Sequence, residues 1–140
     1  MNKVRISKKM LDMFQNAGLR PTKQRLTLAK ILFGRGNRHI TAEQLHNEII
    51  LRNMKVSLAT VYNTLHQFRN AGMLSEVIVE PGHTYFDTNM DDHQHFYHEQ
   101  NKKLEDIPVA DGDILKSIPS TPKGTRVKSV DVVVRISDVS

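Results

Sequence analysis

The stretch from Val56 to Leu74, VSLATVYNTLHQFRNAGML, constrains the fold of this chain more than any other. Its apolar residues recur about every 3.6 positions, which predicts a helix with one buried face. Ser57 stands where an N-cap belongs and Gly72 where a helix ends, so both ends are marked. The expected buried stripe consists of Leu58, Val61, Tyr62, Leu65, Phe68 and Ala71.

The other face of this predicted helix carries hydrogen-bonding side chains of middle length and few charges. These residues are Thr60, Asn63, Thr64, Gln67 and Asn70. A neutral face that both donates and accepts hydrogen bonds suits the base edges in a DNA groove. A polar surface helix without such a role is the alternative, and this pattern alone leaves both interpretations open.

Charge is distributed unevenly along the 140 residues. Residues 1–87 hold 13 Lys and Arg against 6 Asp and Glu, whereas residues 88–140 hold 7 against 9. A basic N-terminal part joined to a mildly acidic C-terminal part favours a polyanion-binding module with a separate partner module.

The chain has no cysteine, which excludes disulfides and thiolate metal sites. Its N-terminus lacks the apolar core of a signal peptide, and no apolar run approaches membrane-spanning length. We therefore expect a cytoplasmic protein without membrane contact.

Three further helices are predicted ahead of the first stretch, at residues 6–17, 19–34 and 41–53. Ser7 can cap the first, Pro21 suits the first turn of the second, and Thr41 with Gln44 forms a capping box on the third. Their expected buried residues are Met10, Leu11, Phe14, Leu26, Ala29, Leu32, Phe33, Ala42, Leu45, Ile49 and Ile50.

A hairpin follows the helices. Residues 74–80 alternate in part, Pro81 and Gly82 make a turn, and residues 84–87 return as a second strand. Closely spaced helices of which the last has a polar outer face form a helix-turn-helix, and the added two-stranded wing predicts a winged helix. Tyr85 and Phe86 are expected to pack the wing or a domain interface.

The predicted architecture is α+β, with a winged helix-turn-helix DNA-binding domain at 1–88, a hinge at 89–92 and a small α/β dimerisation domain at 93–140. The second domain is expected to contain strands at 95–98, 103–107 and 127–136 and a short helix at 111–118. Val130, Val132, Val134 and Ile136 share one face of the last strand. A unit of about 50 residues buries too little surface alone, so we infer that it dimerises.

The segment DDHQHFYHE predicts a metal site. His93 and His95 share a strand face, whereas His98 falls on the opposite one. Imidazole and carboxylate donors without thiolate favour Fe(II), Mn(II) or Zn over Cu(I). The other candidate ligands are Asp87, Asp91, Asp92, Asp106 and the more distant His39. Spacing does not choose among them, and an exposed polar turn is the alternative. A hydrolase built on His93 and His95 lacks the expected helical HExxH or nucleophile turn.

In this order the pieces resemble the ferric uptake regulator family of dimeric metal-responsive transcription factors. The resemblance runs from about residue 17 to 136 and is most specific in LRPTKQRL, HITAEQLHNEI, VSLATVYNTLHQFRNAGML and FDTNMDDHQHF. The absence of cysteine, HQHFYHE, DIP at 106–108 and the terminal VDVVVRI are similar to the Irr branch, the iron response regulators of alpha-proteobacteria that answer to haem status.

The resemblance implies a regulator of iron and haem genes that binds near-palindromic double-stranded DNA as a homodimer, with tetramers as a further state. Its implied divalent metal, Fe or Mn with Zn possible in vitro, would be held by His39, Asp87, His93, His95 and Asp106. Its implied haem ligands are His93 and His95. Its implied DNA contacts are Ser57, Thr60, Tyr62 and Asn63, with Arg20 in the minor groove; packing is the alternative role of Tyr62.

The chain departs from the family pattern in three places. His98 and Asn101 replace the first of two CxxC pairs, so no structural zinc held by four cysteines is expected. DGDILKSIP is shorter than the family's dimerisation helix, and Gln94 interrupts the histidine run that is common in the Irr branch. The same metal-ligand set also resembles the peroxide-sensing branch, which is the alternative function.

Overall fold

The computed structural model describes residues 7–80, 82–90, 94–107, 118–127 and 130–139. The chain divides into two compact units, Met1–Met90 and Asp91–Ser140. This division falls inside the predicted hinge, while the assignment of the two units to DNA binding and dimerisation stays a prediction. Across the described residues, no helix is long and apolar enough to cross a membrane.

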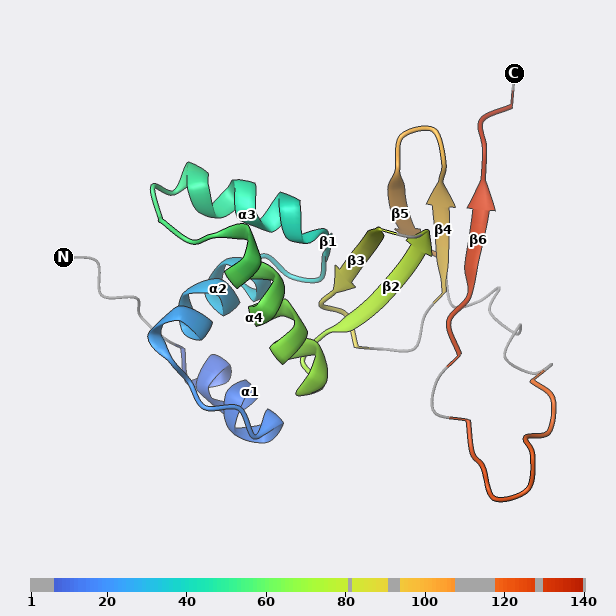
Figure 1. Ribbon diagram of the computed structural model, residues 1–140, viewed down its shortest axis with the longest axis horizontal. Helices are drawn as coiled ribbons and strands as arrows, with labels where there is room; N and C mark the ends of the chain where they lie inside the picture. Colours follow the sequence, from blue (N-terminus) through green and yellow to red (C-terminus); the bar gives the residue numbers. More distant parts are fainter. Residues whose placement is uncertain (1–6, 81, 91–93, 108–117, 128–129, 140) are drawn as a thin grey trace. The chain divides into compact units, whose positions relative to one another are not determined.

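The described part of the first unit contains four helices, which Figure 1 shows gathered together: α1 (Lys8–Ala17), α2 (Lys23–Phe33), α3 (Ala42–Leu51) and α4 (Leu58–Asn70). The capping predictions hold at Ser7, Thr41 and Ser57, each of which accepts a backbone N–H with its side-chain oxygen. The α1 helix ends at Gly18 in the left-handed conformation with φ 66°, which costs glycine little.

Two predictions about α2 need correction. Thr22 is its N-cap, so Pro21 precedes the helix and does not lie in its first turn. Arg20, the residue before the proline, avoids helical geometry. The Thr22 hydroxyl accepts the Arg25 N–H, so the helix begins at Lys23, two residues after Pro21. Leu28 and Ile31 are buried although they were not predicted, and Phe33 is only partly buried.

The hydrophobic core of this unit lies among the helices and against the sheet. Phe68 of α4 packs edge-on against Phe14 of α1, with ring centroids 5.8 Å apart, and meets Phe33 of α2 at 6.0 Å. Val61 and Leu65 of the predicted stripe are also buried, whereas Leu58, Tyr62 and Ala71 are only partly buried. Ile50 of α3, predicted to be buried, is 50% exposed because Leu45 and Ile49 already occupy the buried face.

The predicted two-stranded hairpin is present, and a third short strand extends it to a three-stranded sheet. Its strands are β1 (His39–Ile40), β2 (Ser75–Glu80) and β3 (His83–Asp87), in the antiparallel order β1-β3-β2. The two-residue β1 has no periodicity for sequence analysis to detect. Phe86 of β3 joins the helical core, which confirms its predicted packing role.

The described part of the second unit is a small sheet of β4 (His95–His98), β5 (Lys103–Asp106) and β6 (Val133–Ile136), in the order β5-β4-β6. The β4–β5 hairpin confirms two predicted strands, and β6 lies parallel to β4. The last strand is shorter than predicted, and Val127 and Val130 are exposed at 46% and 41%. The predicted helix at 111–118 falls almost entirely outside the described residues.

Candidate DNA-reading surface and metal ligands

The outer face of α4 borders a depression of about 470 Å³ on the first unit. Asn63 and Gln67 of α4 are exposed there, opposite the segment that enters α2. The depression is lined by Arg20, Thr22, Gln24, Arg25, Thr60, Asn63, Thr64 and Gln67. Two guanidinium groups among neutral amides and hydroxyls can pair with phosphates and base edges on one surface.

Arg25 joins the two sides of this depression. Its Nε donates to Gln67 Oε1 at 3.0 Å, and its Nη1 donates to the Arg20 carbonyl at 2.8 Å. The guanidinium group therefore holds the segment that carries Arg20 against α4. From the sequence, Arg25 is predictable only as part of the basic N-terminal charge, because a hydrogen bond between residues 42 positions apart leaves no local pattern.

The start of α4 is hydrogen-bonded within itself. Ser57 Oγ accepts the Thr60 N–H at 3.1 Å and donates to Thr60 Oγ1 at 2.9 Å. Thr64, predicted to face outward, is 4% exposed and donates its hydroxyl to the Thr60 carbonyl at 2.8 Å. That prediction was wrong because a threonine satisfies its hydroxyl on the preceding helical turn and can then be buried.

Tyr62 connects α4 to α3. Its hydroxyl donates to Glu43 Oε1 at 2.5 Å, and its ring stacks on His66 with centroids 6.4 Å apart. The hydrogen bond to Glu43, then burial and the charge of Glu43, raise the pKa of Tyr62 above its ordinary value. Tyr62 is therefore a protonated donor at neutral pH, held by a protein carboxylate, and Glu43 is a site residue that sequence analysis missed.

In the first unit, His39 and Asp87 form a close pair. They are register partners across β1 and β3, and His39 Nε2 lies 3.1 Å from Asp87 Oδ2. Asp87 is 1% exposed, and its Oδ1 accepts the Asn89 N–H at 2.9 Å. A carboxylate this deeply buried requires a charged or hydrogen-bonding partner.

The second unit repeats this construction. His95 and Asp106 are register partners across β4 and β5, with Nε2 and Oδ1 3.3 Å apart. The side chain of His95 is 7% exposed and that of Asp106 is 45% exposed. On the other face of β4, the Nε2 of His98 lies 2.8 Å from the Oε2 of Glu105. His93 lies outside the described residues, as do Asp91 and Asp92.

Imidazole nitrogen and carboxylate oxygen are a donor set that fits a divalent Fe, Mn or Zn ion. Each unit thus contains a His–Asp pair of register partners with this chemistry, and antiparallel backbone bonds hold both partners of each pair together. The pairs could not be assigned from spacing, because the members of the first lie far apart in the chain and meet only through strand pairing.

The fold defines a two-unit α+β protein with an N-terminal winged helix-turn-helix. The model of the ferric uptake regulator family matches residues 16–136. The chain belongs to this family. Proteins of this family are transcription regulators and not enzymes. This agrees with the sequence-based interpretation, which disfavoured a hydrolase. The narrower resemblance to the Irr branch stays a prediction.

Among curated relatives, a ferric uptake regulation protein of Bordetella parapertussis is 37% identical over 79 residues, which cover 56% of this chain and 57% of the relative. The chain thus spans about half the length of the curated relatives it matches. The manganese-containing ferric uptake regulator of Pseudomonas aeruginosa aligns with a TM-score of 0.74 at 23% identity, over 93% of this chain and 98% of that one. A Campylobacter jejuni peroxide stress regulator aligns with a TM-score of 0.62 at 24% identity, over 95% and 96%.

Proposed function

We propose that this chain is a metal-responsive transcriptional regulator of iron and haem genes that binds near-palindromic DNA as a homodimer in the cytoplasm. The observation that carries the proposal is the surface where α4 and the entry to α2 meet around the depression. Asn63 on this surface is available to read base edges, and Arg20 to enter the minor groove or neutralise phosphate. Ser57, Thr60 and Tyr62 complete the proposed DNA-binding set.

Binding to promoter DNA tests this proposal directly. Fluorescence anisotropy can be measured with fragments of the promoter of the gene that encodes this protein, at several salt concentrations and with Mn²⁺ or EDTA. The affinity of the protein for this DNA should fall steeply as the salt concentration rises. Asn63→Ala should weaken binding to the preferred site by about 1–3 kcal/mol and leave non-specific binding unchanged. Asn16→Ala, an exposed change on α1, is the matched control. Failure to bind DNA at low salt with or without metal overturns the proposal.

The proposed effector is one divalent ion that takes ligands from both His–Asp pairs and from His93. The support is the equal donor chemistry of the two pairs, their equal cross-strand construction and membership of the family. The ion would supply the positive charge that holds two carboxylates and the imidazoles together. Such an ion would make the geometry of the DNA-binding unit depend on metal supply.

Metal titration of single variants tests this site. His39→Ala and His95→Ala should each weaken Mn²⁺ binding at least roughly 10-fold, because each removes a ligand of the same ion. His98→Ala is the matched control, since His98 pairs with Glu105 on the other face of β4. Two ions per chain, of which each variant removes one, would contradict a shared site.

Haem is proposed as a second effector, with His93 or His95 as its axial imidazole ligand. His95 would have to exchange Asp106 for the haem iron, because its side chain is 7% exposed and paired. Haem titration of the His93→Ala, His95→Ala double variant checks these ligands, and an unchanged Soret band would reject them. Addition of one oxygen to a histidine after peroxide treatment, measured by mass spectrometry, would instead support the peroxide-sensing alternative.

A further inference from the structure

The β1–β3 pairing continues for one residue beyond the His39–Asp87 pair, through the neighbours of both ligands. The Arg38 N–H donates to Thr88 Oγ1 at 2.9 Å, and the Thr88 N–H donates to the Arg38 carbonyl at 3.1 Å. Arg38 and Thr88 thus close the end of the ladder on which the candidate ligands lie. Any tilt of this end would change the distance between His39 and Asp87.

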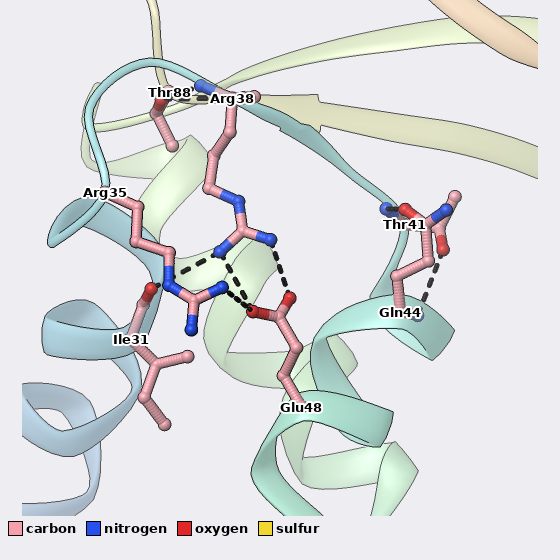
Figure 2. A network of polar contacts seen from close by, with 7 residues as sticks. All are labelled: Ile31, Arg35, Arg38, Thr41, Gln44, Glu48 and Thr88. Carbon is pink, nitrogen blue, oxygen red and sulfur yellow. Dashed lines mark hydrogen bonds and ion pairs between the residues drawn. The ribbon is translucent and has the colours of Figure 1, made fainter. Parts of the chain in front are cut away.

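The side chain of Arg38 fastens this end of the ladder to the helices (Figure 2). Its Nη2 donates to Glu48 Oε2 at 2.6 Å and its Nη1 to Glu48 Oε1 at 3.1 Å, so both carboxylate oxygens of Glu48 on α3 are engaged. The Nη1 also points toward the Ile31 carbonyl of α2 at 3.5 Å. Both side chains are only 21% exposed, so water screens this pair less than a surface pair.

Two parallel hydrogen bonds between a planar guanidinium and a carboxylate fix orientation as well as distance. A lysine at position 38 would keep the positive charge but could not engage both oxygens in this geometry. The pair therefore holds β1 in a defined direction relative to α3, which a simple charge attraction would not achieve.

We propose that Arg38 and Glu48 are positioning residues that orient His39 and Asp87 for the metal ion and link that ion to α3. The proposal rests on the function proposed above. The same helix carries Glu43, which accepts the hydrogen bond from Tyr62 of α4. Through Glu48, α3 contacts Arg38, the chain neighbour of His39, and through Glu43 it contacts Tyr62 of the candidate DNA-reading helix.

Arg35 provides a matched control. Its Nη1 lies 3.5 Å from the same Glu48 oxygen that Arg38 contacts, but its side chain is 62% exposed and makes this one ion pair (Figure 2). An exposed ion pair of this kind contributes little. Arg35→Lys and Arg38→Lys are thus the same chemical change beside the same carboxylate, and only the second removes the bidentate contact.

The test is calorimetric titration of the full chain with Mn²⁺, repeated with Co²⁺, whose absorption spectrum reports coordination geometry. Arg38→Lys is expected to weaken Mn²⁺ binding roughly 10-fold and to alter the Co²⁺ spectrum, as changes in residues that orient metal ligands do. Arg35→Lys should leave both unchanged. Glu48→Gln should have an effect similar to that of Arg38→Lys. The free energy of Mn²⁺ binding lost in the double variant should be smaller than the sum of the losses in the two single variants.

The outcomes separate this inference from the proposed function. If Mn²⁺ binding by the parent chain does not depend on His39, the proposed metal site fails first. If binding depends on His39 but Arg38→Lys behaves like Arg35→Lys, the positioning role is overturned and the metal site stands. Circular dichroism establishes that each variant folds. If Arg38→Lys does not fold, Glu48→Gln decides, and if neither folds the pair acts on folding alone and the proposal is rejected.

Discussion

At the scale of single residues, the hydrogen bond between Tyr62 and Glu43 determines what α4 offers to a partner. The phenol already donates its proton to a carboxylate of α3, so its ring and not its hydroxyl is presented for apolar contact. Such a ring suits the methyl group of thymine. We therefore propose that Tyr62 packs through its hydrogen bond to Glu43 and contacts DNA through its ring, so that its two alternative roles are compatible.

Tyr62→Phe should lower the free energy of unfolding by about 1 kcal/mol, because it removes one hydrogen bond to a charged acceptor in a partly exposed place. Urea denaturation measures the change, and the same substitution in a Glu43→Ala background should cost less. The pKa of Tyr62 is raised above its ordinary value of 10.0. The contribution of the Tyr62–Glu43 hydrogen bond to stability is therefore complete below pH 10 and is lost as the pH rises through the raised pKa. An equal loss of stability on Tyr62→Phe with Glu43 and with alanine at position 43 would contradict a stabilising hydrogen bond between Tyr62 and Glu43.

Phe68→Ala should destabilise the protein by about 3–5 kcal/mol, because the ring is fully buried between α1 and α2. Thermal or urea unfolding measures this loss. Leu51→Ala, at a residue 81% exposed, should have almost no effect and is the matched control.

How far single residues can be predicted depends on whether their partners are local. Ser57 and Thr41 cap helices as predicted, since a cap depends on the next three residues only. The Arg25–Gln67 bond was not predictable, because it joins residues far apart in the chain. Thr64 lies at the spacing of the buried stripe, but its polarity suggested the wrong face.

At the scale of elements, α3 begins with a capping box. Thr41 accepts the Gln44 N–H with its hydroxyl at 3.1 Å, and the Gln44 side chain accepts the Thr41 N–H at 3.0 Å. These reciprocal bonds satisfy two backbone donors at the point where β1 becomes a helix. The capping box thus sets where the ladder that carries His39 stops.

Thr41→Ala should cost about 1 kcal/mol of stability through loss of this cap. Thr27→Ala, inside α2, should be neutral or slightly stabilising because alanine has the higher helix propensity. Chemical denaturation of the two variants side by side measures the difference between their free energies of unfolding. A similar loss in both would show that the cap has no special role.

Helices were predicted better than strands for a physical reason. Ten or more residues of helical period give a repeated signal, whereas β1 has two residues and depends entirely on β3 for its hydrogen bonds. The valine-rich stretch around β6 extends well beyond the strand, yet its pairing with β4 covers Val133–Ile136 alone. Strand propensity indicates where a strand can form, and the length of the neighbour decides where it ends.

At the scale of the whole molecule, the two units differ in their cores. Among the described residues beyond 90, the buried hydrophobic ones are Tyr97 and Leu104. The sheet face that carries Phe96, Val134 and Ile136 is only partly covered. So small a core supports the proposal that a second copy of the chain completes this unit.

Val134→Lys should therefore shift the protein from dimer to monomer, because it places a charge in the apolar face proposed for the dimer. Sedimentation at micromolar concentration measures the assembly state. Val139→Lys, at a residue 99% exposed, is the matched control and should stay dimeric. A monomeric parent chain would contradict the proposed dimer.

The two cross-strand His–Asp pairs have a consequence for how such a protein evolves by recombination. Each pair is complete within one unit, and its geometry is set by the backbone bonds of that unit. A recombination event that joins residues 1–90 of this chain to the C-terminal unit of a relative brings in an intact ligand pair from each parent. Under the proposed function, such a hybrid takes its DNA-reading surface from one parent and its candidate metal ligands from both, with no new ligand pair required at the junction.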